Sequence, residues 1–266
     1  MSNPNSFEEI FSGIICVYFD TYPAASPVIP DYRIVEDIAS EYLSLRPDVL
    51  EKSSASVESL SAYNGFAVPP KEIGSTFTVL INKNVLAENL QNKRMDWVGT
   101  IAHETTHVQD FAQYAQMVSA KDYDTILQIG EHGMFNLWTE IHARSKGYYF
   151  TRKYTLGPEF MKSNLLLSDI MDREIPAQWD MLYERYHATS NGYDQAYLVA
   201  QYIGRLYTLQ QLYPDAFNDA WIRGHFGVND WMTDWFLFFK KYPTLETASE
   251  HFDEMKDILG QNFCGI

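Results

Sequence analysis

Two histidines four residues apart, His103 and His107, are the side chains of this chain best suited to chemistry. If the segment is an α-helix, they project from the same face, because residues i and i+4 are separated by about 40° around the helix axis. Two imidazoles so placed can bind one zinc ion through their ring nitrogens. Glu104 lies about 100° further round the helix, where its carboxylate can take a proton from a metal-bound water. The spacing therefore predicts two metal ligands and a general base.

The residues around the two histidines favour a buried helix. Thr100, Ile101, Ala102 and Val108 are uncharged, and apolar side chains recur at helical spacing in the following turns. No proline or glycine interrupts residues 100–120, so the sequence predicts a continuous helix there. The alternative interpretation is a chance match to a short motif on a core helix.

A catalytic zinc ion commonly has three protein ligands and a water, so a third ligand is expected elsewhere in the chain. Glu140 is the strongest candidate. It lies in a second amphipathic helix that includes residues 135–144, and a carboxylate beside an apolar face is costly unless it is paired or metal-bound. His142 is the main alternative, on another face of the same helix, and cannot readily share the ion with Glu140. His132 and Glu131, in a turn before this helix, are weaker alternatives.

The motif His103-Glu104-Thr105-Thr106-His107, followed by Glu140-Ile141-His142-Ala143, resembles the gluzincins, the thermolysin-like group of zinc peptidases. The resemblance covers roughly residues 76–150. It implies a zincin-like α+β fold, mostly α, with a small sheet whose edge strand lies over the motif helix and a helical C-terminal part. It also implies zinc-dependent hydrolysis of peptide bonds, with the three ligands and the base named above and one Zn²⁺ per chain.

Two positions depart from the pattern of that family. Arg144 stands where thermolysin-like peptidases have an aspartate that orients a zinc-bound histidine, and Gln109 stands where an apolar residue is usual. A histidine ligand still needs an acceptor for its second ring N–H, and Asp110 is a candidate for it. The departures disfavour the thermolysin subfamily itself and leave the predicted ligands unchanged.

Peptide hydrolysis also needs a hydrogen-bond donor for the oxyanion that develops in the transition state. Residue type suggests five candidates, namely Tyr148, Tyr149, His187, Tyr193 and His225. We expect His187 or a tyrosine of the 148–149 pair to act here, so the predicted catalytic set is Glu104, His187 and Tyr149. For each of the five taken singly, a buried ring or hydroxyl bonded to the backbone is the more common role.

The amino-acid composition of the chain limits the classes of molecule that it could bind. The 266 residues include 35 acidic and 20 basic side chains, a net charge of −15 at pH 7, which argues against nucleic acid and anionic membrane surfaces as partners. The longest strongly apolar run, residues 14–19, is far shorter than the roughly 20 residues of a membrane-spanning helix. The first residues lack the pattern of a signal peptide, and Cys16 and Cys264 are expected to be free thiols. We therefore expect a cytoplasmic protein with a peptide or protein substrate.

Apolar spacing and turn residues outline the remaining elements. Residues 32–45 are expected to form a helix that ends at Arg46-Pro47, and residues 76–82 a strand. The resemblance to the gluzincins implies that this strand lies at the edge of the sheet. Residues 53–61 are expected to be a strand or an exposed loop, and residues 63–66 a turn. After residue 150 the chain is expected to be helical over 165–171, 177–186, 193–212, 231–239 and 245–259.

These elements suggest one zincin-like metallopeptidase domain, residues 1–266, in which residues 1–150 carry the sheet and the zinc site and residues 151–266 form a helical subdomain. The aromatic residues between Trp231 and Phe239 are expected to be core. Two functions other than peptide hydrolysis stay open. One is a catalytically inactive zinc-binding module with a regulatory or interaction role, and the other is a helical structural protein. The presence of Glu104 favours the enzyme, because a binding module needs no base.

Overall fold

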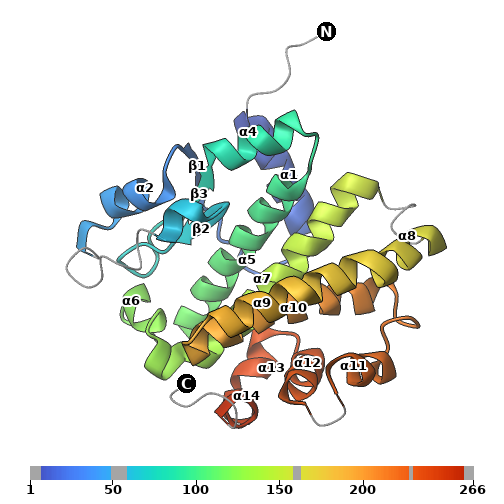
Figure 1. Ribbon diagram of the computed structural model, residues 1–266. Coiled ribbons are helices and arrows are strands. Elements are labelled where there is room, and N and C mark those ends of the chain that lie inside the picture. Colours follow the sequence, from blue (N-terminus) through green and yellow to red (C-terminus); the bar gives the residue numbers. More distant parts are fainter. Residues whose placement is uncertain (1–6, 49–58, 158–162, 228–229, 261–266) are drawn as a thin grey trace. The chain divides into compact units, whose positions relative to one another are not determined.

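A computed structural model of the protein describes residues 7–48, 59–157, 163–227 and 230–260. The chain forms two compact units, residues 1–125 and residues 126–266. Helices predominate, and the described strands form one small sheet (Figure 1). The predicted class, α+β and mostly α, is confirmed. Within the described residues, every helix is too short or too polar to cross a membrane.

The sheet of the first unit has the strand order β1-β3-β2, formed by β1 (Asp31–Val35), β2 (Gly65–Val68) and β3 (Thr78–Asn82). β1 pairs with β3 in parallel, and β2 pairs with β3 in antiparallel register. The strand predicted from residues 76–82 is therefore central, and its prediction as an edge strand was wrong. Its residues 79–82 are all buried, as is usual for a strand covered on both sides.

Helices of the first unit surround this sheet. They are α1 (Phe7–Thr21), α2 (Ile38–Leu45), α4 (Lys83–Gln91) and α5 (Asp96–Met117), with a 3₁₀ helix at Ser59–Ala62 and α6 (Tyr123–Ile126) where the two units divide. α5 packs against α1, α4, β2 and β3 (Figure 1). α2 covers the sheet through a core that includes Ile38, Tyr42, Leu60, Val68 and Leu80.

Two local predictions in this unit need correction. The helix predicted over residues 32–45 begins only at Ile38, because residues 31–35 pair with β3, and Asp37 caps the new helix by accepting from the backbone N–H groups of Ala39 and Ser40. Its predicted end at Arg46 is confirmed. The turn predicted over residues 63–66 contains the start of β2. Of the predicted strand or loop at 53–61, residues 53–58 lie outside the described residues.

The second unit is helical. Its elements are α7 (Ile129–Leu156), α8 (Asn164–Asp169), a π-helical segment Ile170–Glu174, α9 (Ile175–Ala188), α10 (Gly192–Leu212), α11 (Asp219–Phe226), α12 (Trp231–Lys241), α13 (Leu245–Ser249) and α14 (Phe252–Gly260). α10 packs along α7 and also contacts α9 and α12 (Figure 1). The helical segments predicted after residue 150 all lie on these elements. The segment 165–171 runs from α8 into the π-helical segment, and the segment 245–259 divides into α13 and α14.

Several details bear on other predictions. Trp235, Phe236, Phe238 and Phe239 of α12 are buried, as predicted for the aromatic cluster, whereas Trp231, predicted to be core as well, is only half-buried. The division of the units falls at residues 125 and 126, whereas the predicted subdivision at residue 150 falls inside α7. Cys16 is a free and exposed thiol, and Cys264 lies outside the described residues.

Candidate metal centre

Helix α5 carries both histidines of the motif without a break. It runs from Asp96 to Met117, so the continuous helix predicted over residues 100–120 is confirmed up to Met117 and ends three residues earlier than predicted. Both His103 and Glu104 are 7% exposed, and the two threonines that follow them are fully buried. Most of the motif is therefore buried and does not lie on a solvated helix surface.

The two imidazoles face each other. Their Nε2 atoms are 3.1 Å apart, and their ring planes meet at 85°. With each nitrogen about 2.0–2.1 Å from a zinc ion, this separation corresponds to an N–Zn–N angle of roughly 100°, close to tetrahedral. Without a metal, the same separation suits an N–H···N hydrogen bond between the rings. The positions of His103 and His107 thus fit two ligands of one ion.

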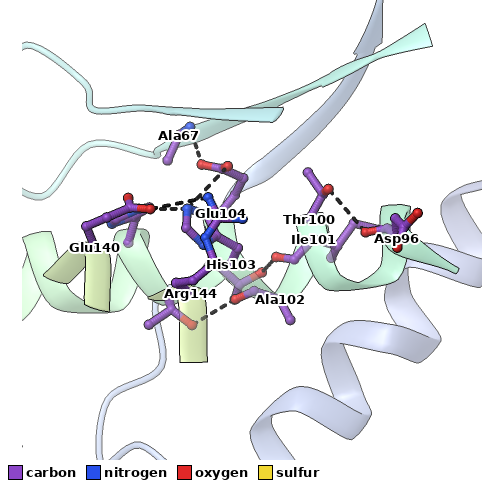
Figure 2. Close-up of polar contacts among 12 residues, drawn as sticks. Ala67, Asp96, Thr100, Ile101, Ala102, His103, Glu104, Glu140 and Arg144 are labelled. Carbon is purple, nitrogen blue, oxygen red and sulfur yellow. Dashed lines mark hydrogen bonds and ion pairs between the residues drawn. The ribbon is translucent and has the colours of Figure 1, made fainter. Parts of the chain in front are cut away.

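Glu104 reaches from α5 to the edge strand β2. Its Oε2 accepts a hydrogen bond from the backbone N–H of Ala67 at 2.9 Å, and its Oε1 is 4.0 Å from Nε2 of His103 (Figure 2). Gly65 permits this approach, because a Cβ at that position would lie 2.6 Å from Cγ2 of Thr100 and 3.1 Å from Cγ of Glu104. The carboxylate is therefore oriented by β2 and lies beside the histidine pair.

The two threonines within the motif anchor α5 to its neighbours. Each donates to the backbone carbonyl one turn earlier. The hydroxyl of Thr105 is also 2.7 Å from that of Tyr32 in β1, and the hydroxyl of Thr106 is 2.9 Å from that of Tyr18 in α1. Burial raises the pKa of both tyrosines well above its usual value, so both stay protonated. The sequence analysis assigned no role to these four residues.

Gln109, one of the two departures from the family pattern, has a structural partner. Its Oε1 accepts from the backbone N–H of Val28 at 2.9 Å, and its Nε2 donates to the carbonyl of the same residue at 2.6 Å. This pair of bonds fixes the loop before β1 against α5. Asp110 is 3% exposed, and its charge contributes to the raised pKa of Tyr18. Its role as acceptor for a histidine ligand stays a prediction.

Glu140 belongs to the second unit, where it is almost fully buried on α7 at 1% exposed. Its Oε1 accepts from Nη2 of Arg144 at 3.3 Å, and its Oε2 accepts from the hydroxyl of Tyr197 in α10 at 2.9 Å. Arg144, the other departure from the family pattern, therefore pairs with Glu140 itself. The sequence analysis did not single out Tyr197, which is marked only by its place in an amphipathic helix.

The other candidates for the third ligand also lie on α7. His142 is half-buried, and its ring packs 4.8 Å from that of Trp138. His132 is buried at a kink, where its φ of −114° and ψ of 17° depart from helical values. The side chain of Glu131 lies outside the described residues.

The structure places the predicted oxyanion donors Tyr149 and His187 at different positions in the second unit. Tyr149 follows Glu140 by nine residues, which turns it about 180° around α7 and moves it roughly 13 Å along the axis. His187 is exposed near the end of α9, where its Nδ1 lies 2.8 Å from the carbonyl oxygen of Tyr183. Their catalytic roles stay predictions that these positions do not favour.

The three remaining candidates for that role have identifiable surroundings. Tyr148 donates to Glu174. His225 lies 2.8 Å from the hydroxyl of Tyr202 and stacks on a neighbouring indole. Burial raises the pKa of Tyr193, and the charge of Glu140 contributes to the same shift. Of the five candidates, Tyr193 is thus the one that these observations associate with Glu140.

Comparisons of the chain with protein-family models, with curated proteins and with solved structures found no match. The resemblance to the gluzincins therefore rests on the motif residues, and any function rests on the chemistry of the side chains described above.

Proposed function

We propose that the protein is a zinc-dependent peptidase with a zincin-like fold, in which His103, His107 and Glu140 bind one zinc ion and Glu104 is the general base. The observation that carries the proposal is the histidine pair, with Nε2 atoms 3.1 Å apart and the Glu104 carboxylate beside them.

The donor set suits a catalytic zinc ion. Two imidazole nitrogens and one carboxylate oxygen leave a coordination position for water or substrate. A bound zinc ion supplies two effects, a lowered pKa of water and polarisation of the substrate carbonyl. Arg144 and Tyr197 each hold one oxygen of Glu140, and such partners orient a ligand and tune its basicity.

The role of Glu104 follows from how it is held. The hydrogen bond from Ala67 fixes Oε2, and this sets the orientation of the whole carboxylate next to His103. Glu104 takes a proton from the attacking water and delivers it to the nitrogen of the leaving amine. Glutamine at this position keeps the shape of the side chain and the acceptor for Ala67 but is not a base.

The edge strand β2 offers a place for an extended substrate. A peptide can add to an exposed sheet edge as a further strand, and β2 is the edge strand that contacts α5. The N–H of Ala67 is already bonded to Glu104, so we expect a substrate to pair with other backbone groups of β2. For the oxyanion donor, Tyr193 is our choice, since it is the candidate on whose hydroxyl the charge of Glu140 acts.

The test combines metal content with turnover. Elemental mass spectrometry of the purified protein should find about one zinc per chain, and His103→Ala and Glu140→Ala should lose it, whereas the control His142→Ala should keep it. Glu104→Gln should keep the zinc and lower peptide hydrolysis by a factor of about 10² to 10⁴.

Each alternative predicts a different result. Wild-type protein that binds no zinc even when zinc is supplied would make the motif a coincidence on a core helix. Zinc without hydrolysis of any peptide in a diverse pool would favour the inactive zinc-binding module. Hydrolysis by Glu104→Gln at the wild-type rate would exclude Glu104 as the base.

A further inference from the structure

Two arginines of the second unit come from helices that touch. At Gly204, α10 lies so close to α7 that an added Cβ would be 2.6 Å from the carbonyl oxygen of Ile141 and 2.8 Å from Cβ of Arg144. Arg205 is the next residue of α10. Arg144 and Arg205 therefore leave the two helices where the helices lie close together.

The guanidinium groups of this pair are poorly compensated. Nε of Arg144 is buried without a hydrogen-bond partner, and its Nη2 makes a 3.3 Å bond to Glu140. Arg205 is half-buried and has no hydrogen bond or ion pair within the described part of the chain. Burial lowers the pKa of Arg205 and the positive charge of Arg144 lowers it further, and these two effects outweigh the opposite effects of Tyr148, Glu174 and Glu140. Two cations thus lie near each other in a partly buried place.

The carboxylates near the arginine pair have other partners. Glu174 forms an ion pair with Arg152 and accepts hydrogen bonds from Tyr148 and Gln178. Glu140 accepts from Tyr197, and as a zinc ligand it would share its charge with the metal. A buried charge is stable only with a counter-charge or good hydrogen bonds. The arginine pair therefore suits an anion that is not part of this chain.

We propose that Arg144 and Arg205 bind the free C-terminal carboxylate of a peptide substrate, so that the protein removes residues from the C-terminus. The inference rests on the proposed function, because Glu140 as a zinc ligand is what puts the reaction next to the arginine pair. Guanidinium groups match a carboxylate with paired N–H donors, and arginine is preferred for this purpose.

The short distance along α7 between Glu140 and Arg144 favours the C-terminal carboxylate of the substrate over a charged group further along the peptide. Arg144 is one helical turn from Glu140, about 6 Å along the axis. One to two residues of extended peptide span about 3.5–7 Å. A carboxylate held at the arginine pair would thus end the substrate one or two residues beyond the scissile bond. An acidic side chain has the same chemistry, and the experiment must separate the two sources.

The first experiment measures binding without catalysis. N-acetyl-phenylalanine and its amide are titrated by calorimetry into zinc-loaded wild-type protein, Arg205→Gln, Arg205→Lys and the exposed control Arg223→Gln, with the zinc content of each measured. The acid should bind and the amide should bind at least about 10-fold more weakly, a difference expected for loss of charge-assisted hydrogen bonds. Arg205→Gln should remove this preference, Arg205→Lys should retain part of it, and Arg223→Gln should retain all of it.

Two outcomes of the titration bear on different parts of the inference. An acid that binds Arg205→Gln as tightly as wild type would overturn the arginine site, since the carboxylate would then be held by the zinc or elsewhere. If the wild-type protein holds no zinc, the same titration on metal-free protein still tests the arginine site, while the proposed function has failed separately. The melting temperature of ligand-free Arg205→Gln should equal or exceed that of wild type, because the variant removes an uncompensated charge.

The second experiment identifies the source of the carboxylate. Matched peptide pools with free or amidated C-termini, each containing glutamate or glutamine near the end, are incubated with the enzyme and their products are identified by mass spectrometry. Loss of C-terminal residues from the free pools, at least about 10-fold faster than from the amidated pools, would support the inference. Equal internal cleavage of all pools, or cleavage that follows glutamate whatever the C-terminus, would overturn it.

Discussion

At the scale of single residues, the polar groups of the candidate centre are held by partners from distant parts of the same unit. Glu104 is held by the backbone of β2, Thr105 by Tyr32 of β1, and Glu140 by Tyr197 of α10. Such support fixes a reactive group before the substrate arrives, which is where much of catalytic power originates. The contribution of each tyrosine hydroxyl to the centre can therefore be tested by a single substitution.

Replacing Tyr197 by phenylalanine should weaken zinc binding by about 10-fold, because Glu140 would lose the hydrogen bond to its Oε2. The measurement is competition for zinc against a chromophoric chelator. The matched control is Tyr207→Phe on the same helix, whose hydroxyl makes no hydrogen bond within the described residues. Equal zinc affinity of wild type and Tyr197→Phe would show that the contact does not support a metal ligand.

His225 should make the second unit more stable at neutral than at acid pH. Burial lowers the pKa of His225 below its ordinary value of 6.5. As the pH falls through 6.5, His225 is therefore protonated in the unfolded chain before it is protonated in the folded one. The free energy of unfolding decreases from this pH down to the lower pKa of the folded state. Thermal unfolding between pH 7.5 and 5 should show a smaller loss for His225→Phe than for wild type. A steeper loss in the variant would contradict the assignment.

How far the site could be predicted depends on sequence separation. The histidines and Glu104 lie within one helical turn, so their spacing alone revealed them. The side chains that hold them come from distant parts of the sequence, so spacing could not reveal them. Tyr18 and Thr106 are 88 residues apart, Tyr32 and Thr105 are 73 apart, and Tyr197 and Glu140 are 57 apart. Residue type indicated that tyrosines were available, but only the packing of the helices selects which hydroxyl lies at which atom.

At the scale of elements, α5, α10 and α12 were predicted well because each has apolar side chains at helical spacing, whereas α1, α4 and α11 were not predicted. The sheet was predicted less well. β2 has only four residues and begins with glycine, so its local preference for a strand is weak. Its pairing with β3 and its contact with α5 decide its conformation. The same long-range pairing turned the start of the predicted helix at residue 32 into β1 and made β3 a central strand.

Gly65→Ala should disturb the contact between β2 and α5. The added methyl would lie 2.6 Å from Cγ2 of Thr100 and 3.1 Å from Cγ of Glu104, so one of the elements must move. We expect a loss of about 1–3 kcal/mol in the free energy of unfolding, together with slower peptide hydrolysis, because Glu104 would shift. Chemical denaturation and the peptide assay would measure the two effects.

The control is Gly13→Ala in the exposed face of α1, where nothing lies within 4 Å of the added Cβ. Alanine is the better helix former there by up to about 1 kcal/mol, so this variant should be unchanged or more stable. If Gly65→Ala were as stable and as active as Gly13→Ala, close approach of β2 would not be what positions Glu104.

At the scale of the whole molecule, charge is the dominant feature. The 35 acidic side chains exceed the 20 basic ones, so many surface carboxylates have no cation near them. Some cations are committed to partly buried pairs, such as the buried Arg46 with Asp48 and Asp124. An excess of one charge sign opposes the compact state by self-repulsion. The stability of the protein should therefore increase with ionic strength, whereas ion pairs alone would make it decrease.

Added salt should raise the melting temperature at pH 7. Between about 10 mM and 150 mM sodium chloride the Debye length falls from about 30 Å to about 8 Å. This change screens repulsion across the surface more than it weakens partly buried pairs such as Arg46–Asp48. Thermal unfolding at the two salt concentrations measures the effect. The control is the same comparison near pH 4.8, the isoelectric point of the sequence, where the net charge vanishes and the rise should disappear. A melting temperature that falls with salt at pH 7 would mean that attractive surface ion pairs outweigh the repulsion of the excess carboxylates.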